Sequence, residues 1–484
     1  MVRSISNYAV YALVALGVSL SAIGVFYQYS YWWDELNSVV AAGLSLTEMF
    51  DIFILVDVHP PLYMMLLGAW VDLFGPGERQ VRFLSFLFAA SSLYFIASWA
   101  RDEMDDVGFK TVILFFSTAP LFVFYSQEAR SYAMMLFLAS VLTTCYLKSY
   151  HLEGMKRFFI FSCLSVLLSL THYFGFVYAG LIIIFSLFES RREIRRSLSI
   201  VFTGLVCFIW PAIHLFKGSV GEKSGDNFWI KSEGFQSTIS SLSSGLTPQI
   251  NILAGKLGGE MYREYLAALV FIILFVLVVA LARKGRGLIK SPGSSILLKL
   301  TALVSFFALI MIAIDYHSPI STRRNYIVLL PAFSILLGLA VQGMKSIGFK
   351  YLMVAVVIGG IGNIGIASVN VKSKVSPMQN NSGAVEYIEE ENSEGDNIYY
   401  LARNGTSMPE VQKMMAEFYF SDDDIEIEPV FIEDIYSIES PFFMLMQQQS
   451  HDLDEIVDEF RSVGAEVGYI TPQRNQSVAV LYSK

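Results

Sequence analysis

The chain contains little charge and little cysteine. Only 16% of its 484 residues are Asp, Glu, Lys or Arg, and three are cysteines. Cys145, Cys163 and Cys207 all lie within apolar segments. No disulfide framework is therefore predicted, and the cysteines indicate no cellular compartment. The two halves of the chain also lack polar interruptions at matched positions, which the inverted repeats of secondary transporters would show.

Hydrophobic residues are abundant instead. They make up 54% of the chain and fall into runs of about 18–22 residues, each long enough as a helix to cross a hydrocarbon core of about 30 Å. We therefore predict an α-helical polytopic membrane protein with about eleven transmembrane helices. The predicted spans are 9–27, 81–100, 111–126, 132–149, 157–171, 173–189, 198–216, 264–282, 296–314, 326–343 and 351–371.

The positions of the basic loops predict the orientation. Loops 191–196 and 283–286, with Lys345 and Lys350, fall on one side if the spans alternate, and this basic side is expected to be cytoplasmic. We therefore predict an integral protein of the plasma membrane. Alternation then assigns to the outer face Asp34, His59, 127–131, 217–262, 315–325 and everything after about 372.

The C-terminal tail differs from the rest of the chain in charge. Residues 376–484 carry about 22 acidic and 5 basic side chains, which predicts a water-facing extracytoplasmic domain and argues against a nucleic-acid partner. We divide the chain into a membrane domain, 1–374, and this acidic domain, 376–484. Its pattern predicts a small α/β fold with strands at 398–402, 430–432, 442–446, 467–470 and 478–482 and helices at 409–420 and 453–463.

Asp34 and Glu35 directly follow the first predicted span. A carboxylate at the bilayer centre costs about 2.5–3.5 kcal/mol, so the pair belongs at the water interface, where ionisable groups favour a functional interpretation. A carboxylate near arginines stays ionised and can take a proton from an attacking hydroxyl. Asp34 is therefore a candidate general base. Glu35 is expected to orient Asp34 or the acceptor, with a structural role as the alternative.

Basic residues gather at the same predicted face. His59 precedes two prolines that predict the first turn of a helix over 60–74, so His59 would stand at a helix N-terminus, where anions bind. Arg130, Arg323 and Arg324 offer planar, permanently charged donors that match phosphate oxygens. Together these residues predict a site for a phosphorylated ligand.

Plainer interpretations stay open at this point. Interfacial acids and arginines often only cap helices or extend to the headgroups, and Glu128 could pair with Arg130 alone. A divalent metal is a further alternative, although the HxxxH and HxH spacings typical of metal sites are absent. Its candidate ligands are Asp57, His59, His172 and His317.

Four motifs occur in a distinctive order: Asp34-Glu35 after the first span, His59-Pro60-Pro61, the segment 126–132 after the third span, and Arg324-Asn325-Tyr326 at the tenth. In this order they resemble the GT-C glycosyltransferase superfamily, in the branch that contains protein O-mannosyltransferases and the lipid A aminoarabinose transferase. The resemblance covers most of 1–345, and the acidic tail fits the family's C-terminal extracytoplasmic module. Two positions depart from the pattern: Asn37 replaces an arginine, and Asn325 separates Arg324 from Tyr326.

The resemblance implies a membrane glycosyltransferase that moves a sugar from a polyprenyl-phosphate donor, with inversion, to a lipid, glycan or protein acceptor on the outer side. It implies that Asp34 is the catalytic base, with Glu35 beside it. We expect donor-phosphate contacts from His59, Arg130, Arg323, Arg324 and Tyr326. From the remaining polar residues of the outer face we expect substrate contacts from Asp57, Gln127, Glu128, Tyr132 and His172. No cofactor is implied with certainty, and a divalent metal stays open.

The alternative is a transporter or flippase for a lipid-linked sugar, because such a protein would also gather charges at a membrane cavity. It predicts functional polar groups at both faces and near the midplane, whereas the centres of the predicted spans are nearly free of ionisable residues. A receptor with an acidic outer domain would leave the interfacial cluster unexplained. The expected partners are the lipid-linked donor, its acceptor and membrane lipid.

Overall fold

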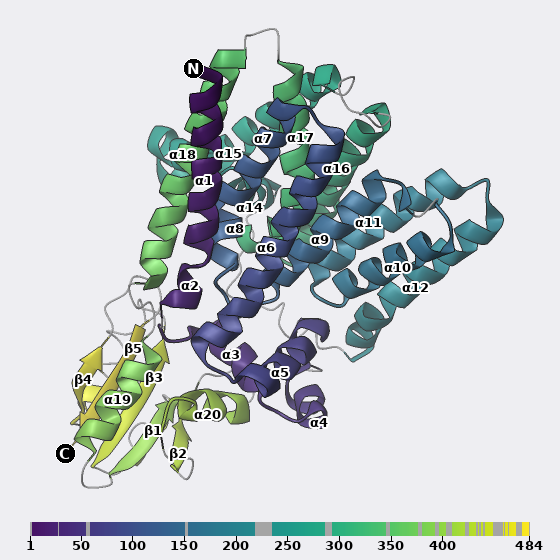
Figure 1. Ribbon diagram of the computed structural model, residues 1–484. Coiled ribbons are helices and arrows are strands. Elements are labelled where there is room, and N and C mark those ends of the chain that lie inside the picture. Colours follow the sequence, from purple (N-terminus) through teal and green to yellow (C-terminus); the bar gives the residue numbers. More distant parts are fainter. Residues whose placement is uncertain are drawn as a thin grey trace. The chain divides into compact units, whose positions relative to one another are not determined.

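The computed structural model of the chain consists of two compact units (Figure 1). The first comprises Met1–Ile23, Ile54–Tyr63 and Phe83–Val371, and the second Gly24–Phe53, Met64–Arg82 and Lys372–Lys484. The acidic tail therefore forms one unit with two segments from the first 82 residues. The structure describes residues 2–27, 29–54, 59–150, 153–217, 235–285, 293–344, 349–375, 380–392, 396–402, 409–421, 425–431, 434, 437–438, 441–448, 458, 460–462, 464–470 and 477–483.

The first unit is helical. Its helices, including the greater part of α6, are α1 (Val2–Ser21), α6 (Glu78–Glu103), α7 (Asp106–Thr118), α8 (Pro120–Tyr125), α9 (Tyr132–Leu147), α10 (Met155–Ser169), α11 (Tyr173–Ser190), α12 (Ile194–Lys217), α14 (Phe235–Leu246), α15 (Pro248–Gly285), α16 (Gly293–His317), the 3₁₀-helix η4 (Arg323–Leu329), α17 (Leu330–Gly343) and α18 (Phe349–Val375).

Ten of the eleven predicted spans fall on one of these helices or on two consecutive ones, and the first, 9–27, falls on α1 and on α2 (Ile23–Phe26) at the unit boundary. Within the described ranges, six helices are long and apolar enough to cross a membrane. The polytopic helical fold is therefore confirmed, while the count of eleven spans stays a prediction. One boundary differs clearly: α15 begins at Pro248, well before 264, and is interrupted at Gly259, whose φ of 64° suits glycine.

Close packing in this unit depends on small residues. α7 and α17 meet at Gly108 and Gly338, where a Cβ on Gly338 would lie 3.1 Å from the Gly108 carbonyl oxygen. α7 begins at an N-cap, Asp105, whose carboxylate accepts the N–H groups of Val107 and Gly108. Without a hydrophobic driving force in lipid, such close backbone approach is a main source of helix association.

The N-terminal part of the second unit contains short helices: α3 (Trp33–Ala42), α4 (Leu46–Glu48) and most of the π-helix η1 (Met49–Ile54) and α5 (Leu62–Phe74), while α2 (Ile23–Phe26) begins at the unit boundary. α5 confirms the helix predicted over 60–74, and it starts directly after the two prolines. A capping box of Ser45 and Glu48 begins α4. Gly68 lets α5 approach the end of α3, because a Cβ there would lie 3.3 Å from the Ala42 oxygen.

The C-terminal part of this unit is an α/β fold. Its elements are α19 (Asn381–Glu391), β1 (Asn397–Leu401), α20 (Pro409–Glu417), β2 (Ile427–Val430), β3 (Phe442–Gln448), β4 (Glu466–Ile470) and β5 (Ser477–Ser483). The strands form one sheet in the order β2-β1-β3-β5-β4, in which β1 pairs parallel with β2 and β3, and β5 pairs antiparallel with β3 and β4.

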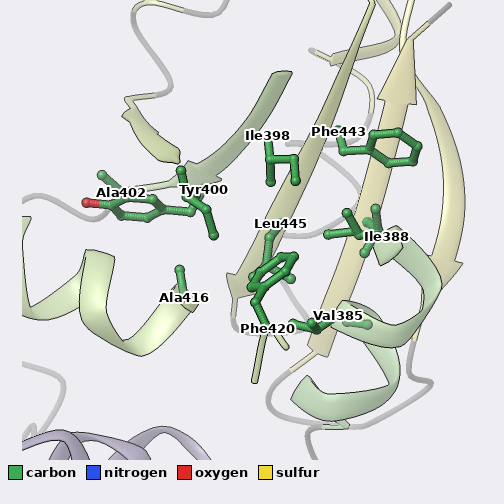
Figure 2. Packing of buried hydrophobic residues seen from close by; sticks show 12 residues of the cluster. Val385, Ile388, Ile398, Tyr400, Ala402, Ala416, Phe420, Phe443 and Leu445 are labelled. Atoms are coloured by element: carbon green, nitrogen blue, oxygen red, sulfur yellow. The ribbon is translucent and has the colours of Figure 1, made fainter. Parts of the chain in front are cut away.

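Both faces of this sheet are covered by hydrophobic clusters, and alternate side chains of β3 contribute to each. Phe443 and Leu445 face α19 and α20 and pack with Val385, Ile388 and Phe420 (Figure 2). The intervening Met444 and its neighbours pack on the opposite face around Phe460. The α/β prediction is confirmed. The strand expected at 430–432 lies earlier, at Ile427–Val430, where it pairs with β1 in register. Most of the helix expected at 453–463 lies outside the described residues, although 458 and 460–462 are helical.

Candidate active site

His59 and Arg130 lie together in the first unit. Arg130 donates a hydrogen bond from Nη2 to Nε2 of His59 across 3.4 Å, and the Arg130 side chain is only 6% exposed. Arginine can only donate, so Nε2 of His59 is the acceptor of this hydrogen bond. The loop of His59 is held in place by the start of α5, where the Leu62 N–H donates to the Leu170 oxygen at the end of α10.

His172 completes this basic cluster from the start of α11. Its ring lies 5.5 Å from that of His59 and 5.7 Å from that of Tyr132. Nδ1 of His172 accepts the Phe174 N–H and so caps α11. In the neutral ring the proton is therefore on Nε2, which remains a donor. His172 serves both as a helix cap and as a member of the cluster.

Arg323 and Arg324 are adjacent in sequence but have different environments. The Arg324 guanidinium lies over the Tyr132 ring, 5.6 Å from its centroid, and its side chain is partly buried. A cation over an aromatic face is stabilised electrostatically and is held in orientation. The Arg323 side chain is exposed. The structure therefore brings Arg324, together with Tyr132, to the cluster of His59, Arg130 and His172.

The segment that carries these arginines is fixed by Asp315, at the end of α16. One carboxylate oxygen accepts the N–H groups of Ile320 and Ser321, each at 3.0 Å, and the other accepts the Thr238 hydroxyl of α14 at 2.8 Å. α14 also meets η4 at Gly245, where a Cβ would lie 2.8 Å from the Arg323 oxygen. Part of the long predicted loop 217–262 thus supports the arginine-bearing segment.

Three other predicted residues are buried in supporting positions. Tyr326 is fully buried, its hydroxyl donates to Ser321 at 2.9 Å, and its ring packs on Phe174. Gln127 is also fully buried and donates to the Val123 oxygen. The Glu128 oxygen of the main chain accepts a hydrogen bond from Ser85. These contacts orient the turn between α8 and α9 and the start of η4.

Asp34 and Glu35 belong to the second unit, in the first turn of α3. Glu35 is 1% exposed and forms a two-pronged ion pair with Arg82: Nε donates to Oε1 at 3.0 Å and Nη2 to Oε2 at 2.7 Å. Such a forked pair fixes the orientation of both side chains. Asp34 precedes it and is partly exposed, and its carbonyl oxygen accepts the Ser38 hydroxyl. The two acids therefore differ in environment: Glu35 is bound to arginine inside the unit.

Arg82 was not identified from the sequence as a functional residue. It lies near the start of a predicted span and is fully buried. Its guanidinium also donates to the Tyr29 and Ser30 oxygens and lies 3.8 Å from the centre of the Tyr29 ring. The sequence signal was an arginine at the edge of an apolar run, since such a charge needs a partner. His214 was missed too: it is buried on α12 and contacts Tyr173 and the Ile54 oxygen.

Asp57 lies outside the described residues. Among those that are described, no group of three or more His, Cys, Asp or Glu side chains could hold a metal ion. The three cysteines are free.

Comparisons with known proteins identify the fold. No family model and no curated protein matches the chain. Its structure is similar to the crystal structure of ArnT from Cupriavidus metallidurans in the apo state, with a TM-score of 0.53, 13% identity and 97% of each chain covered. It is equally similar to ArnT from Cupriavidus metallidurans bound to undecaprenyl phosphate, with a TM-score of 0.52, 12% identity and the same coverage.

The chain has the GT-C fold. The resemblance expected from the sequence motifs is thereby confirmed at the level of the fold, over 97% of the chain and not only over 1–345. ArnT is the lipid A aminoarabinose transferase, the enzyme to which the sequence motifs were compared. An identity of 13% supports no transfer of individual residue roles, which depend on the geometry described above.

Proposed function

We propose that the protein is a membrane glycosyltransferase that transfers a sugar from a polyprenyl-phosphate donor to an acceptor hydroxyl or amine on the extracytoplasmic side. The observation that carries the proposal is the basic cluster of His59, Arg130, His172 and Arg324 within a GT-C fold. Guanidinium and imidazole donors suit a phosphate group. The binding of undecaprenyl phosphate by ArnT, which shares this fold, supports a lipid phosphate as the bound group.

The mechanism we propose is a single displacement. The acceptor oxygen or nitrogen attacks the anomeric carbon as the bond from that carbon to the phosphate oxygen breaks, which inverts the configuration. Asp34 takes the proton of the acceptor, and polyprenyl phosphate leaves as the anion. Arg130 and Arg324 stabilise the charge that develops on the leaving phosphate, so no general acid is needed. His59 orients the guanidinium of Arg130, and Nε2 of His172 adds a hydrogen bond to the phosphate.

Glu35 has a different role in this proposal. Its carboxylate is engaged by Arg82 within the second unit, so we assign it to positioning of the α3 turn and not to proton transfer. Tyr326 and Gln127, which are fully buried, support the cluster through the segments that carry it. The substrate contacts of Tyr132 and Glu128 stay predictions, and so does the donor-phosphate contact of Arg323, which its exposure makes a minor one.

The test is transfer of radiolabelled sugar by the purified protein in nanodiscs. A panel of undecaprenyl-phosphate-linked hexoses and pentoses serves as donors. Native membrane extract supplies the acceptor, so release of label from the lipid can be measured before the acceptor is identified. We expect Asp34→Asn to abolish release while binding of undecaprenyl phosphate persists, because the base acts only in the chemical step.

Arg130→Ala should instead weaken binding of undecaprenyl phosphate and slow release by roughly 10²–10³-fold, as for other preorganised donors of charge stabilisation. Near-normal release by Asp34→Asn would disprove the role of the base. Movement of the intact donor across the bilayer without release of label would replace the proposal by a flippase.

A further inference from the structure

The start of α3 has no side-chain cap of its own. Its N-cap residue is Trp32, which makes no capping hydrogen bond. Tryptophan lacks the acceptor oxygen with which Ser, Thr, Asp or Asn satisfies the first free N–H groups of a helix. The segment that leads into Asp34 is instead bound by side chains from other parts of the second unit.

One contact comes from the start of α19. The Asn381 amide donates from Nδ2 to the Tyr31 oxygen at 2.8 Å, and Asn381 is 2% exposed. Next to it, the Ser382 N–H donates to the Ser30 hydroxyl at 3.0 Å, and the two hydroxyls of Ser30 and Ser382 lie 2.6 Å apart. Residues 350 positions apart in the chain are thus joined by buried polar contacts.

A second contact comes from the turn that follows α20. The Tyr31 N–H donates to the Tyr419 hydroxyl oxygen at 2.8 Å, and the Tyr419 hydroxyl in turn donates to Glu78 at 3.0 Å. The ring of Phe418 packs edge-on against that of Tyr31, with centroids 6.0 Å apart. Both polar main-chain groups of Tyr31 are therefore bound by side chains of the C-terminal domain.

Arg82 adds the third contact, through the Tyr29 and Ser30 oxygens and the Glu35 carboxylate. α20 also packs directly against α3. Every main-chain oxygen from Tyr29 to Tyr31 accepts a hydrogen bond from a side chain distant in the sequence. Three residues later the chain reaches Asp34.

We infer that the C-terminal domain positions the helix that bears Asp34, through the hydrogen bonds that the Tyr419 hydroxyl and the Asn381 amide make to the main chain of Tyr31. This inference rests on the proposed role of Asp34 as the base. Tyr419 and Asn381 are positioning residues and do not touch the substrate. The domain is thus a structural partner of the helix that bears Asp34.

The first test is hydrogen exchange on the full chain in nanodiscs, which needs no donor. Tyr419→Phe keeps the ring but removes the acceptor for the Tyr31 N–H and the donor to Glu78. We expect peptides that cover 29–36 to exchange at least 10-fold faster. The matched control is Tyr387→Phe, which removes a phenol hydroxyl of α19 that lies beside Gly468 of β4. It should leave 29–36 unchanged.

The second test is release of labelled sugar from whichever undecaprenyl-phosphate sugar the wild-type protein uses. Tyr419→Phe and Asn381→Ala should each lower kcat by about 10- to 100-fold, because small misplacements of a reacting group have effects of this size. The KM for the donor should stay within about twofold, because the basic cluster belongs to the first unit. General destabilisation would instead lower the thermal unfolding midpoint, and it would not lower kcat while leaving KM unchanged.

The outcomes separate the two proposals. Full activity of Asp34→Asn would reject the base and, with it, this inference. An inactive Asp34→Asn together with normal exchange and normal kcat in Tyr419→Phe would reject only the positioning role. Faster exchange at 29–36 with unchanged kcat would show that the contacts are structural and that the reaction does not depend on them, which also overturns the inference.

Discussion

The buried pair of Glu35 and Arg82 provides the sharpest prediction. In Arg82→Met a side chain of similar length replaces the guanidinium, but the two hydrogen bonds to Glu35 and those to the Tyr29 and Ser30 oxygens are lost. The Glu35 carboxylate is then left 1% exposed without its cation. Because a buried charge without a partner is costly, we expect the N-terminal turn of α3 to lose stability, and not only one contact.

The magnitude follows from the burial of both partners, 0% and 1% exposed. Breaking a buried ion pair by removing one member costs about 3–5 kcal/mol. At about 1.4 kcal/mol per factor of ten, local opening of this segment should become more frequent by two to almost four orders of magnitude. Replacing both members by apolar residues of similar volume is often close to neutral. The double variant Glu35→Leu/Arg82→Met should therefore recover most of the loss.

Hydrogen exchange of peptides covering 29–42 measures this opening directly, because exchange reports the free energy of local unfolding. The control is Arg79→Met, which removes an exposed arginine one turn earlier on α6 and should change exchange by less than about twofold. An increase below threefold in Arg82→Met would refute the reasoning. So would a double variant that exchanges as fast as the single one, since the uncompensated charge would then not be the cause.

Three further predictions concern the two units separately. Arg324→Ala should weaken binding of undecaprenyl phosphate at least 10-fold, and Arg323→Ala by less than threefold, because only Arg324 is partly buried over Tyr132; equal effects would contradict the assignment. Burial raises the pKa of Tyr31 and that of Tyr419, although Arg82 opposes the effect in both. Their contribution to stability is therefore complete below about pH 10 and is lost as the pH rises further. The thermal unfolding midpoint should therefore decrease as the pH is raised above about 10, and it should decrease less steeply in Tyr419→Phe. The same slope in both proteins would reject this prediction. Asp315→Ala should release α14 from the arginine-bearing segment, because it removes the acceptor of the Thr238 hydroxyl. Hydrogen exchange of peptides covering 235–246 should become faster, and unchanged exchange would refute this prediction.

The helical membrane fold was predictable because a long apolar run indicates both that the segment lies in lipid and that it is helical. In lipid the main chain has to satisfy its own hydrogen bonds, so an apolar run of sufficient length can only be a helix. The strands of the tail followed from alternation in the same way, with β3 as the clearest case. β2 was displaced because its position is decided by pairing with β1, which is distant in the sequence.

The residue types of the site were predictable, but their roles were not. Asp34 and Glu35 are adjacent acids that the sequence alone does not separate, and only the ion pair of Glu35 with Arg82 distinguishes them. Arg323 and Arg324 are equally close to the predicted boundary, and the turn of η4 decides which of them lies over Tyr132. Tyr326 matched the family pattern, yet its hydroxyl is used by Ser321 within the protein.

By itself, the sequence determined that this is a polytopic helical membrane protein with an acidic α/β tail, because hydrophobicity and charge act locally and leave a regular pattern. It also determined that acidic and basic residues gather near the ends of the apolar runs. The tertiary structure alone decided that the tail forms one unit with the segment around Asp34, and that Tyr419 and Asn381 hold Tyr31. These contacts join residues 350 and 388 positions apart, and no local pattern of hydrophobicity or charge encodes them.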